Sequence, residues 1–243
     1  MTVASNPVFV AIDTPDQAMA RALAIALVPH VGGIKIGKEF FTSLGPAAVR
    51  DTVGDAALFL DLKFHDIPNT VAGAVRAAVG LQPRLLTIHA GGGRAMMEAA
   101  AQAAEEAAGA VGCPRPKVVA VTVLTSLSDR DMQDVGFTGS ADEMVLRLAQ
   151  LAQDSGIDGV VCSPREIEAI RKVCGDEFHL VVPGIRPAGS DAGDQKRVMT
   201  PRQALDAGAS VLVIGRPITG AADPVAAAQE IKHDLGLYEL DSE

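Results

Sequence analysis

Short apolar segments rich in β-branched residues recur along the whole chain, separated by longer segments of mixed polarity. Each apolar segment is bounded by turn residues, which is the pattern of strands buried on both faces of a parallel sheet. The pattern predicts eight strands, over residues 8–12, 33–36, 58–62, 85–88, 118–123, 159–162, 180–182 and 211–214.

The segments between the predicted strands carry helical patterns. They predict helices over residues 15–28, 94–109, 142–155, 164–173, 201–207 and 224–235. Three of these helices are expected to start at a capping residue that proline follows, at Ser163, Thr200 and Asp223. The first helix is expected to start in the same way, with Thr14 as its cap and Pro15 at its first position.

Eight strands that alternate with helices in 243 residues predict a (β/α)₈ TIM barrel, with residues 1–243 forming a single domain. A doubly wound sheet is the alternative, but it normally carries a glycine-rich turn after its first strand. Here the first strand ends in Ile12-Asp13-Thr14-Pro15, without glycine. The polar stretch 186–198 is long for a connection in a compact domain, and we interpret it as a lid or binding loop.

Charge and composition narrow the range of partners. The chain has 21 basic and 30 acidic residues, a formal charge of −9, and 3% aromatic residues, so we expect no nucleic-acid partner. No apolar run approaches the roughly 20 residues of a membrane span. The first basic residue is Arg21, which argues against a signal peptide. We therefore expect no membrane partner and a cytoplasmic location.

Polar residues stand at or just after the carboxyl ends of most predicted strands. In a barrel these ends form the face that carries the active site. Burying a polar group costs free energy unless the group is paired or has a function, and some of these residues are expected only to pair with one another. The set therefore contains candidates for the site. It comprises Asp13, Lys35, Asp61, Lys63, His89, Thr125, Ser126, Arg186, Gly215 and Arg216.

The third predicted strand carries the most informative polar residues. Side chains two apart share one face of a strand, which puts Asp61 and Lys63 within pairing distance, and Lys35 on the neighbouring strand is placed to join them. In such a cluster each charge keeps its neighbour ionised, so a lysine remains an ammonium that serves as an acid or as electrostatic support. A buried ion-pair network that only fixes the barrel mouth is the alternative, and spacing alone does not separate the two.

A second candidate feature is the turn after the last strand, where barrels often bind phosphate. Gly215 allows close approach of the backbone, and Arg216 offers a guanidinium fork to phosphate oxygens, although an ordinary barrel closure has the same residues. Arg186 and Gln195 are placed to cover a phosphate from the long loop. The remaining motifs predict no metal site, because the histidines do not fall into ligand spacing with carboxylates. We interpret His65 and His89 as structural residues held by hydrogen bonds.

The chain resembles the bacterial type of orotidine 5′-phosphate decarboxylase, from the first strand to the turn after the last. The most specific match is DLKFHDIPNT at residues 61–70. VPGIR at 182–186, DQ at 194–195 and GRPI at 215–218 follow in the family's order. The resemblance implies decarboxylation of orotidine 5′-phosphate to UMP and CO₂, the last step of UMP synthesis, with neither cofactor nor metal.

The resemblance also implies roles for single residues. Lys63 would protonate C6 of the pyrimidine within a charged tetrad of Lys35, Asp61, Lys63 and Asp66. Asp13 and Lys35 would hold the ribose hydroxyls, Thr125 and Ser126 would lie near the pyrimidine, and Gln195, Gly215 and Arg216 would bind the phosphate with Arg186 beside them. Ile67 would be a further substrate contact. A homodimer is implied, in which Asp66 and Thr70 reach the neighbouring site.

Two other functions remain open. A metal-dependent barrel acting on a sugar phosphate, such as a 3-hexulose-6-phosphate synthase or a pentulose-phosphate epimerase, would share the barrel and the phosphate turn. The spacing Asp61-x-Lys63-x-x-Asp66, with IPNT after it, favours the decarboxylase. A non-catalytic nucleotide-binding or scaffold protein on the same fold would be expected to have lost its acid, but Lys63 is present.

Overall fold

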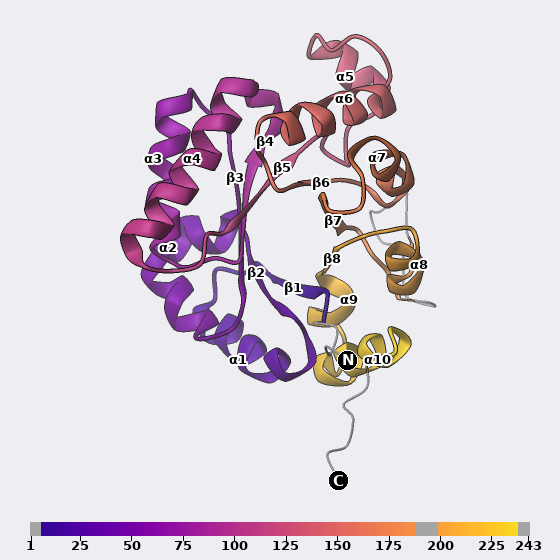
Figure 1. The fold of residues 1–243 in the computed structure, drawn as a ribbon. Helices are drawn as coiled ribbons and strands as arrows, with labels where there is room; N and C mark the ends of the chain where they lie inside the picture. Colours follow the sequence, from indigo (N-terminus) through magenta and orange to yellow (C-terminus); the bar gives the residue numbers. More distant parts are fainter. Residues whose placement is uncertain (1–5, 188–198, 238–243) are drawn as a thin grey trace.

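Eight parallel strands form a closed barrel in the order in which they occur along the chain. The structure is a computed structural model that describes residues 6–187 and 199–237. Helices surround the ring of strands (Figure 1). The strands are β1 (Val8–Ile12), β2 (Gly33–Ile36), β3 (Leu58–Phe64), β4 (Leu85–His89), β5 (Lys117–Val121), β6 (Gly159–Val161), β7 (His179–Pro183) and β8 (Val211–Ile214). The predicted TIM barrel is confirmed.

Among the described residues, the segments outside the strands carry α-helices and three short 3₁₀ helices. The helices are α1 (Gln17–Leu27), α2 (Lys38–Val53), α3 (Pro68–Val79), α4 (Arg94–Val111), α5 (Asp129–Asp134), α6 (Ala141–Asp154), α7 (Ile167–Cys174), α8 (Pro201–Asp206), α9 (Arg216–Thr219) and α10 (Pro224–Asp234). The 3₁₀ turns are η1 (Val28–His30), η2 (Ala90–Gly92) and η3 (Pro164–Glu166). Within the described ranges, no helix is both long and apolar enough to cross a membrane.

The start of the first helix differs from the prediction. Asp16 caps α1, because its side chain accepts the backbone N–H of Met19, and Thr14 and Pro15 lie before the cap. The starts predicted at Thr200 and Asp223 are confirmed, and both side chains accept a backbone N–H three residues on.

Three helix features were missed or simplified in the sequence analysis. Helix α2 was not among the predicted helices, and Gly45, with φ of +76°, and Pro46 interrupt its helical pattern. Helices α3, α5 and α9 were also not predicted. The segment predicted as one helix from Pro164 begins as the 3₁₀ turn η3 and continues as α7.

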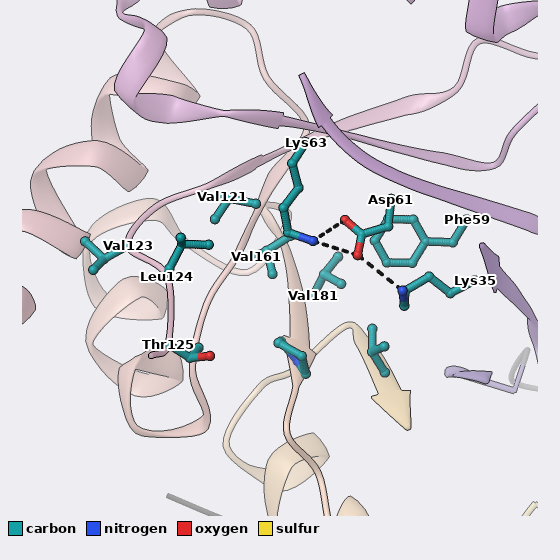
Figure 2. A pocket seen from close by; sticks show the side chains of 12 residues that line it. Lys35, Phe59, Asp61, Lys63, Val121, Val123, Leu124, Thr125, Val161 and Val181 are labelled. Carbon is teal, nitrogen blue, oxygen red and sulfur yellow. Dashed lines mark hydrogen bonds and ion pairs between the residues drawn. The ribbon is translucent and has the colours of Figure 1, made fainter. Parts of the chain in front are cut away.

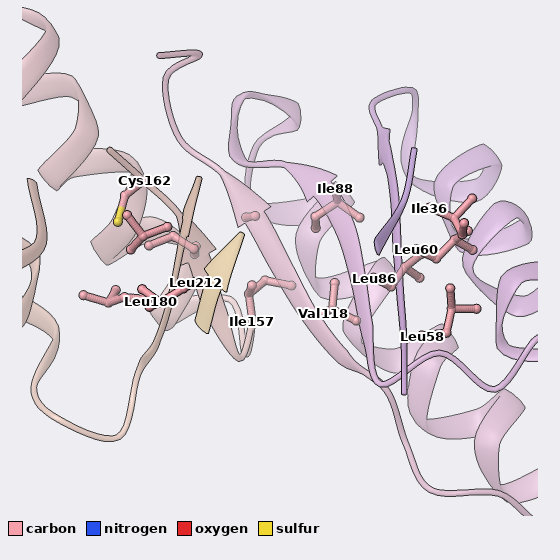
Figure 3. Packing of buried hydrophobic residues seen from close by; sticks show 14 of the residues in the cluster. Ile36, Leu58, Leu60, Leu86, Ile88, Val118, Ile157, Cys162, Leu180 and Leu212 are labelled. Carbon is pink, nitrogen blue, oxygen red and sulfur yellow. The ribbon is translucent and has the colours of Figure 1, made fainter. Parts of the chain in front are cut away.

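Alternate residues of the strands serve two different cores. Side chains such as Ile36, Leu60, Leu86 and Ile88 belong to the large cluster that also contains the buried helix residues (Figure 3). The barrel interior is filled by a second cluster of Phe9, Phe59, Leu85, Val119, Val181 and Val213. The rings of Phe9 and Phe59 meet edge to face, with centroids 6.1 Å apart. These closely packed apolar side chains form a rigid base for the polar residues further along the same strands.

Candidate active site

Three charged side chains meet over a cavity of about 290 Å³ inside the barrel (Figure 2). Lys63 Nζ donates to both carboxylate oxygens of Asp61, at 2.7 and 2.8 Å. Lys35 Nζ from β2 lies 3.3 Å from Asp61 Oδ2. The predicted cluster of Lys35, Asp61 and Lys63 is therefore confirmed in its geometry, and all three residues line the cavity.

The pKa of the Asp61 carboxyl reflects burial opposed by its neighbours. Burial by itself would raise this pKa, but the ammonium groups of Lys35 and Lys63 and the hydrogen bonds from Lys63 and Thr87 outweigh it, so the pKa is lowered. Asp61 is therefore an anion at neutral pH. Its side chain is 12% exposed, whereas that of Lys63 is 25% exposed. The more buried Asp61 carboxylate thus holds the Lys63 ammonium at the cavity.

Strand β3 is distorted where it carries these charges. Leu60 pairs with Leu86 and Phe64 pairs with Ile88, so three residues of β3 lie opposite the single β4 residue Thr87. At this bulge Lys63 has φ of +54°, in the left-handed region that non-glycine residues rarely adopt. Such a conformation costs on the order of 1–3 kcal/mol and persists only where surrounding contacts hold it.

Asp13 lies at the mouth of the barrel after β1. Its Oδ1 accepts the backbone N–H of Phe40 in the first turn of α2, at 2.9 Å. Gly37 lies against the same carboxylate so closely that a Cβ at this position would overlap it. The exposed Asp13 is therefore held in one orientation by α2 and by the absence of a side chain at Gly37.

Apart from the charged residues, the lining of the cavity is mostly apolar. Its lining includes Val121, Val123, Leu124, Val161, Val181, Pro183 and Val213. Thr125 also lines the cavity, whereas Ser126 is exposed and is not among the lining residues. A planar ring of low polarity on one edge matches a space that is charged on one side and apolar on the other.

The candidate phosphate residues come from the ends of β7 and β8. Arg186 is 9% exposed, and its Nη1 donates to the carbonyl of Ile185 at 3.0 Å. Gly215 directly precedes α9, and Arg216 is the first residue of α9 and is exposed. Gln195, like most of the loop 186–198, lies outside the described residues.

Asp66, Ile67 and Thr70, which follow Lys63 in the chain, are not among the residues that line the cavity of their own chain. Asp66, Ile67 and Thr70 are all exposed, Ile67 with 68% of its surface. Asp66 Oδ1 accepts the backbone N–H of Ile67 at 2.7 Å. Within one chain the structure thus brings together three members of the predicted tetrad but not Asp66.

The rings of His65 and His89 lie against each other in a tilted arrangement beside the cluster. Their ring centroids are 5.2 Å apart with 31° between the planes. The described residues give neither ring a hydrogen-bond partner, so the interpretation of both as hydrogen-bonded structural residues stays a prediction. Burial lowers the pKa of His89 to about 4, aided by the positive charges of its neighbours, including Lys38 and Lys63. His89 is therefore neutral at neutral pH.

This lowered pKa predicts a loss of stability in mild acid. Between pH 6.5, the ordinary value, and about 4, the unfolded chain binds a proton at His89 that the folded chain does not. The free energy of unfolding therefore falls as the pH falls through this window. We expect His89→Gln to lose less stability than the wild type in urea unfolding between about pH 7 and pH 4. His179, whose pKa burial also lowers, is the same in both proteins. Equal pH dependence in the two proteins would contradict the assignment.

Across residues 6–187 and 199–237, no group of three or more His, Cys, Asp and Glu side chains is arranged to hold a metal ion.

Comparison with known proteins gives a family. The family model of the "Orotidine 5'-phosphate decarboxylase / HUMPS family" matches residues 6–231. The chain belongs to this family. It is 57% identical over 233 residues to orotidine 5′-phosphate decarboxylase of Paramagnetospirillum magneticum, covering 96% of this chain and 99% of the relative. The enzyme of the same name from Moorella thermoacetica is 55% identical, covering 96% and 94% of the two chains.

A solved structure supports the same relationship. Orotidine 5′-phosphate decarboxylase from Lactobacillus acidophilus superposes on this member of the family with a TM-score of 0.82 at 38% identity, covering 95% of this chain and 99% of the other.

Two residues of the site in this family member were missed in the sequence analysis. Thr87 lies between Asp61 and the Lys63 backbone. A threonine within an apolar strand carries no signal of such a role, because threonine is a common strand former. Gly37 was also missed. The signal that could have found it is its position directly after the second strand, where most of the other strands are followed by polar residues.

Proposed function

We propose that this chain decarboxylates orotidine 5′-phosphate to UMP and CO₂, the last step of UMP synthesis, at the cavity lined by Lys35, Asp61 and Lys63. The observation that carries the proposal is the Lys63 ammonium, which an ionised carboxylate at 2.7 Å fixes at the edge of an otherwise apolar cavity. The names of the relatives support the same substrate.

The reaction needs a positive charge and a proton at one place. When the bond between C6 and the substrate carboxylate breaks, CO₂ leaves and the electron pair remains on C6, where the ring offers no position to delocalise it. An ammonium group fixed next to C6 stabilises this charge without reorganisation and then transfers a proton from Nζ to C6. Lys63 supplies both functions, and neither a cofactor nor a metal enters this proposal.

Asp61 and the cavity wall set the conditions for Lys63. The Asp61 carboxylate binds the ammonium groups of Lys35 and Lys63 and lies where it would repel the carboxylate of the substrate. The apolar wall excludes water, which strengthens electrostatic interactions in the cavity. Burial would by itself raise the pKa of Asp61, but the ammonium groups of Lys35 and Lys63 and the hydrogen bonds from Lys63 and Thr87 lower it, so Asp61 remains ionised.

The remaining candidates are proposed to bind the rest of the substrate. Asp13 and Lys35 would hold the ribose hydroxyls, since both lie at the ends of neighbouring strands, and Thr125 and Ser126 would lie near the pyrimidine. Arg186, Gln195, Gly215 and Arg216 would hold the phosphate. Binding energy from the phosphate would serve to place C6 against Lys63.

We further propose a homodimer with shared sites. Asp66, Ile67 and Thr70 are exposed in the single chain and lie a few residues beyond Lys63, so a second copy could bring them to the neighbouring cavity. Asp66 would then complete the charged tetrad. A cytoplasmic location and the absence of nucleic-acid partners stay predictions of the sequence.

A substrate comparison tests this function. The purified protein is incubated with orotidine 5′-phosphate, the change from orotate to uracil absorbance is followed, and the product is identified as UMP by chromatography. A hexulose 6-phosphate and a pentulose 5-phosphate, each with Mg²⁺, are tested in parallel. We expect turnover of orotidine 5′-phosphate alone. Turnover of a sugar phosphate and not of the nucleotide would replace the proposal with the metal-dependent alternative.

A further inference from the structure

Thr87 is a fully buried polar residue that touches both parts of the β3 bulge. It lies on β4, is 0% exposed and is not among the residues lining the cavity. Its Oγ1 lies 2.8 Å from the backbone N of Lys63 and 3.0 Å from Asp61 Oδ1. One hydroxyl group therefore links the backbone of the proposed proton donor to the carboxylate that orients its ammonium.

The chemistry of the three groups fixes the direction of both hydrogen bonds. A backbone N–H only donates, so Thr87 Oγ1 accepts from Lys63. An ionised carboxylate only accepts, so the proton of the Thr87 hydroxyl is directed to Asp61. The Thr87 hydroxyl therefore accepts one hydrogen bond and donates another. A residue without a hydroxyl at this position would leave the backbone N–H of Lys63 without this partner.

The bulge explains why a side chain is needed here. Three residues of β3 lie opposite Thr87 alone, so the regular pairing of backbone groups between β3 and β4 is interrupted at this point. Thr87 replaces the missing backbone acceptor for Lys63, whose φ of +54° needs contacts that hold it. The position of the Lys63 side chain in the cavity follows from this backbone conformation.

We infer that Thr87 is a positioning residue for the decarboxylation, which holds the Lys63 backbone in the bulge and the Asp61 carboxylate in the orientation that binds the Lys63 ammonium with both oxygens. The inference rests on the proposed function. Thr87 does not line the cavity and is fully buried, so it does not touch the substrate. It acts only through Lys63 and Asp61.

Two matched pairs of variants separate the hydroxyl from the shape of the side chain. Thr87→Val keeps the shape and removes the hydroxyl, and Thr87→Ser keeps the hydroxyl and removes a methyl group. We expect Thr87→Val to lower kcat about 10²-fold, as small displacements of catalytic groups do, with little change in KM. We expect Thr87→Ser to stay within about tenfold of the wild type. If Thr87→Val does not fold, Thr87→Ser and Thr87→Ala form a second pair that differs only in the hydroxyl.

The pH profile adds a readout that a purely structural role would not change. Asp61 is faced by Lys35 from β2, by Lys63 on its own strand, and by Thr87 and the neutral His89 from β4. Removing the Thr87 hydrogen bond takes away one of the contacts that lower the pKa of Asp61. The acid limb of kcat is therefore expected to move to higher pH in Thr87→Val and to stay in place in Thr87→Ser.

Thr122 provides the control. It is also a buried threonine, 6% exposed, directly after β5, and its hydroxyl bonds the carbonyl of Val161 at 3.3 Å without touching the charged cluster. Thr122→Val should keep the wild-type kcat and pH profile. The inference is overturned if Thr87→Val has the wild-type kcat, or if the Val and Ser variants lose activity equally. Failure of the wild type to turn over orotidine 5′-phosphate would refute the proposed function instead.

Discussion

An equimolar mixture of two inactive variants, Lys63→Met and Asp66→Ala, is expected to recover about a quarter of the wild-type activity. In the proposed dimer each site takes Lys63 from one chain and Asp66 from the other. A mixed dimer therefore has one site with both substitutions and one site with neither. Random pairing of two chains makes half of the dimers mixed, so roughly one site in four is intact. The physical basis is that Asp66 is exposed and is not among the residues lining the cavity of its own chain.

The matched control mixes Lys63→Met with Asp61→Ala. Asp61 and Lys63 are hydrogen-bonded within one chain at 2.7 and 2.8 Å, so every site of a mixed dimer carries one of the two substitutions. We expect no recovery from this mixture. Specific activity is measured after subunit exchange, and native mass spectrometry establishes that mixed dimers have formed. Mixed dimers without recovery in the first mixture would contradict the shared site.

Replacing Lys63 by methionine is expected to lower kcat by about 10⁴-fold or more. Methionine keeps an unbranched side chain but removes both the positive charge next to C6 and the proton that C6 receives. General acid catalysis typically contributes about 10²–10⁴-fold, and one preorganised electrostatic contact contributes about 10²–10³-fold. The steady-state rate with orotidine 5′-phosphate measures the loss.

Two controls accompany this variant. Circular dichroism and thermal unfolding test whether Lys63→Met is folded. We expect it to fold, because Asp61 still has Lys35 and Thr87 as partners. Lys172→Met removes an exposed lysine on α7, remote from the cavity, and should leave kcat unchanged. A folded Lys63→Met protein with more than about a tenth of the wild-type kcat would remove Lys63 from the role of proton donor.

The barrel could be predicted because its strands differ sharply from their surroundings. Strands covered by helices on one side and by the barrel interior on the other are apolar along most of their length, and the runs in the sequence show this directly. The two-residue period placed Asp61 and Lys63 on one face, and the parallel neighbour placed Lys35 beside them. These relationships depend only on local geometry and on the order of the strands.

Other features depend on contacts that no local pattern records. The bulge in β3 arises from how β3 and β4 pair, so neither the positive φ of Lys63 nor the role of Thr87 was predicted. Gly45 and Pro46 interrupt the helical pattern of α2, so this helix was not predicted. Asp16 rather than Thr14 caps α1 because its side chain is the one that reaches a free backbone N–H of the helix. In the proposed dimer, the position of Asp66 relative to a cavity depends on a second chain.

The measurement that tests the central claim most directly is the turnover of orotidine 5′-phosphate by chelator-treated protein in EDTA, with Lys63→Met beside it. The claim is that the cluster of Lys35, Asp61 and Lys63, completed by Asp66 of a second copy, decarboxylates this nucleotide without a metal. We predict that the wild type forms UMP at the same rate with EDTA as with added Mg²⁺, and that the folded variant forms almost none. A wild-type rate that appears only with the metal, or that survives in the variant, would contradict the account.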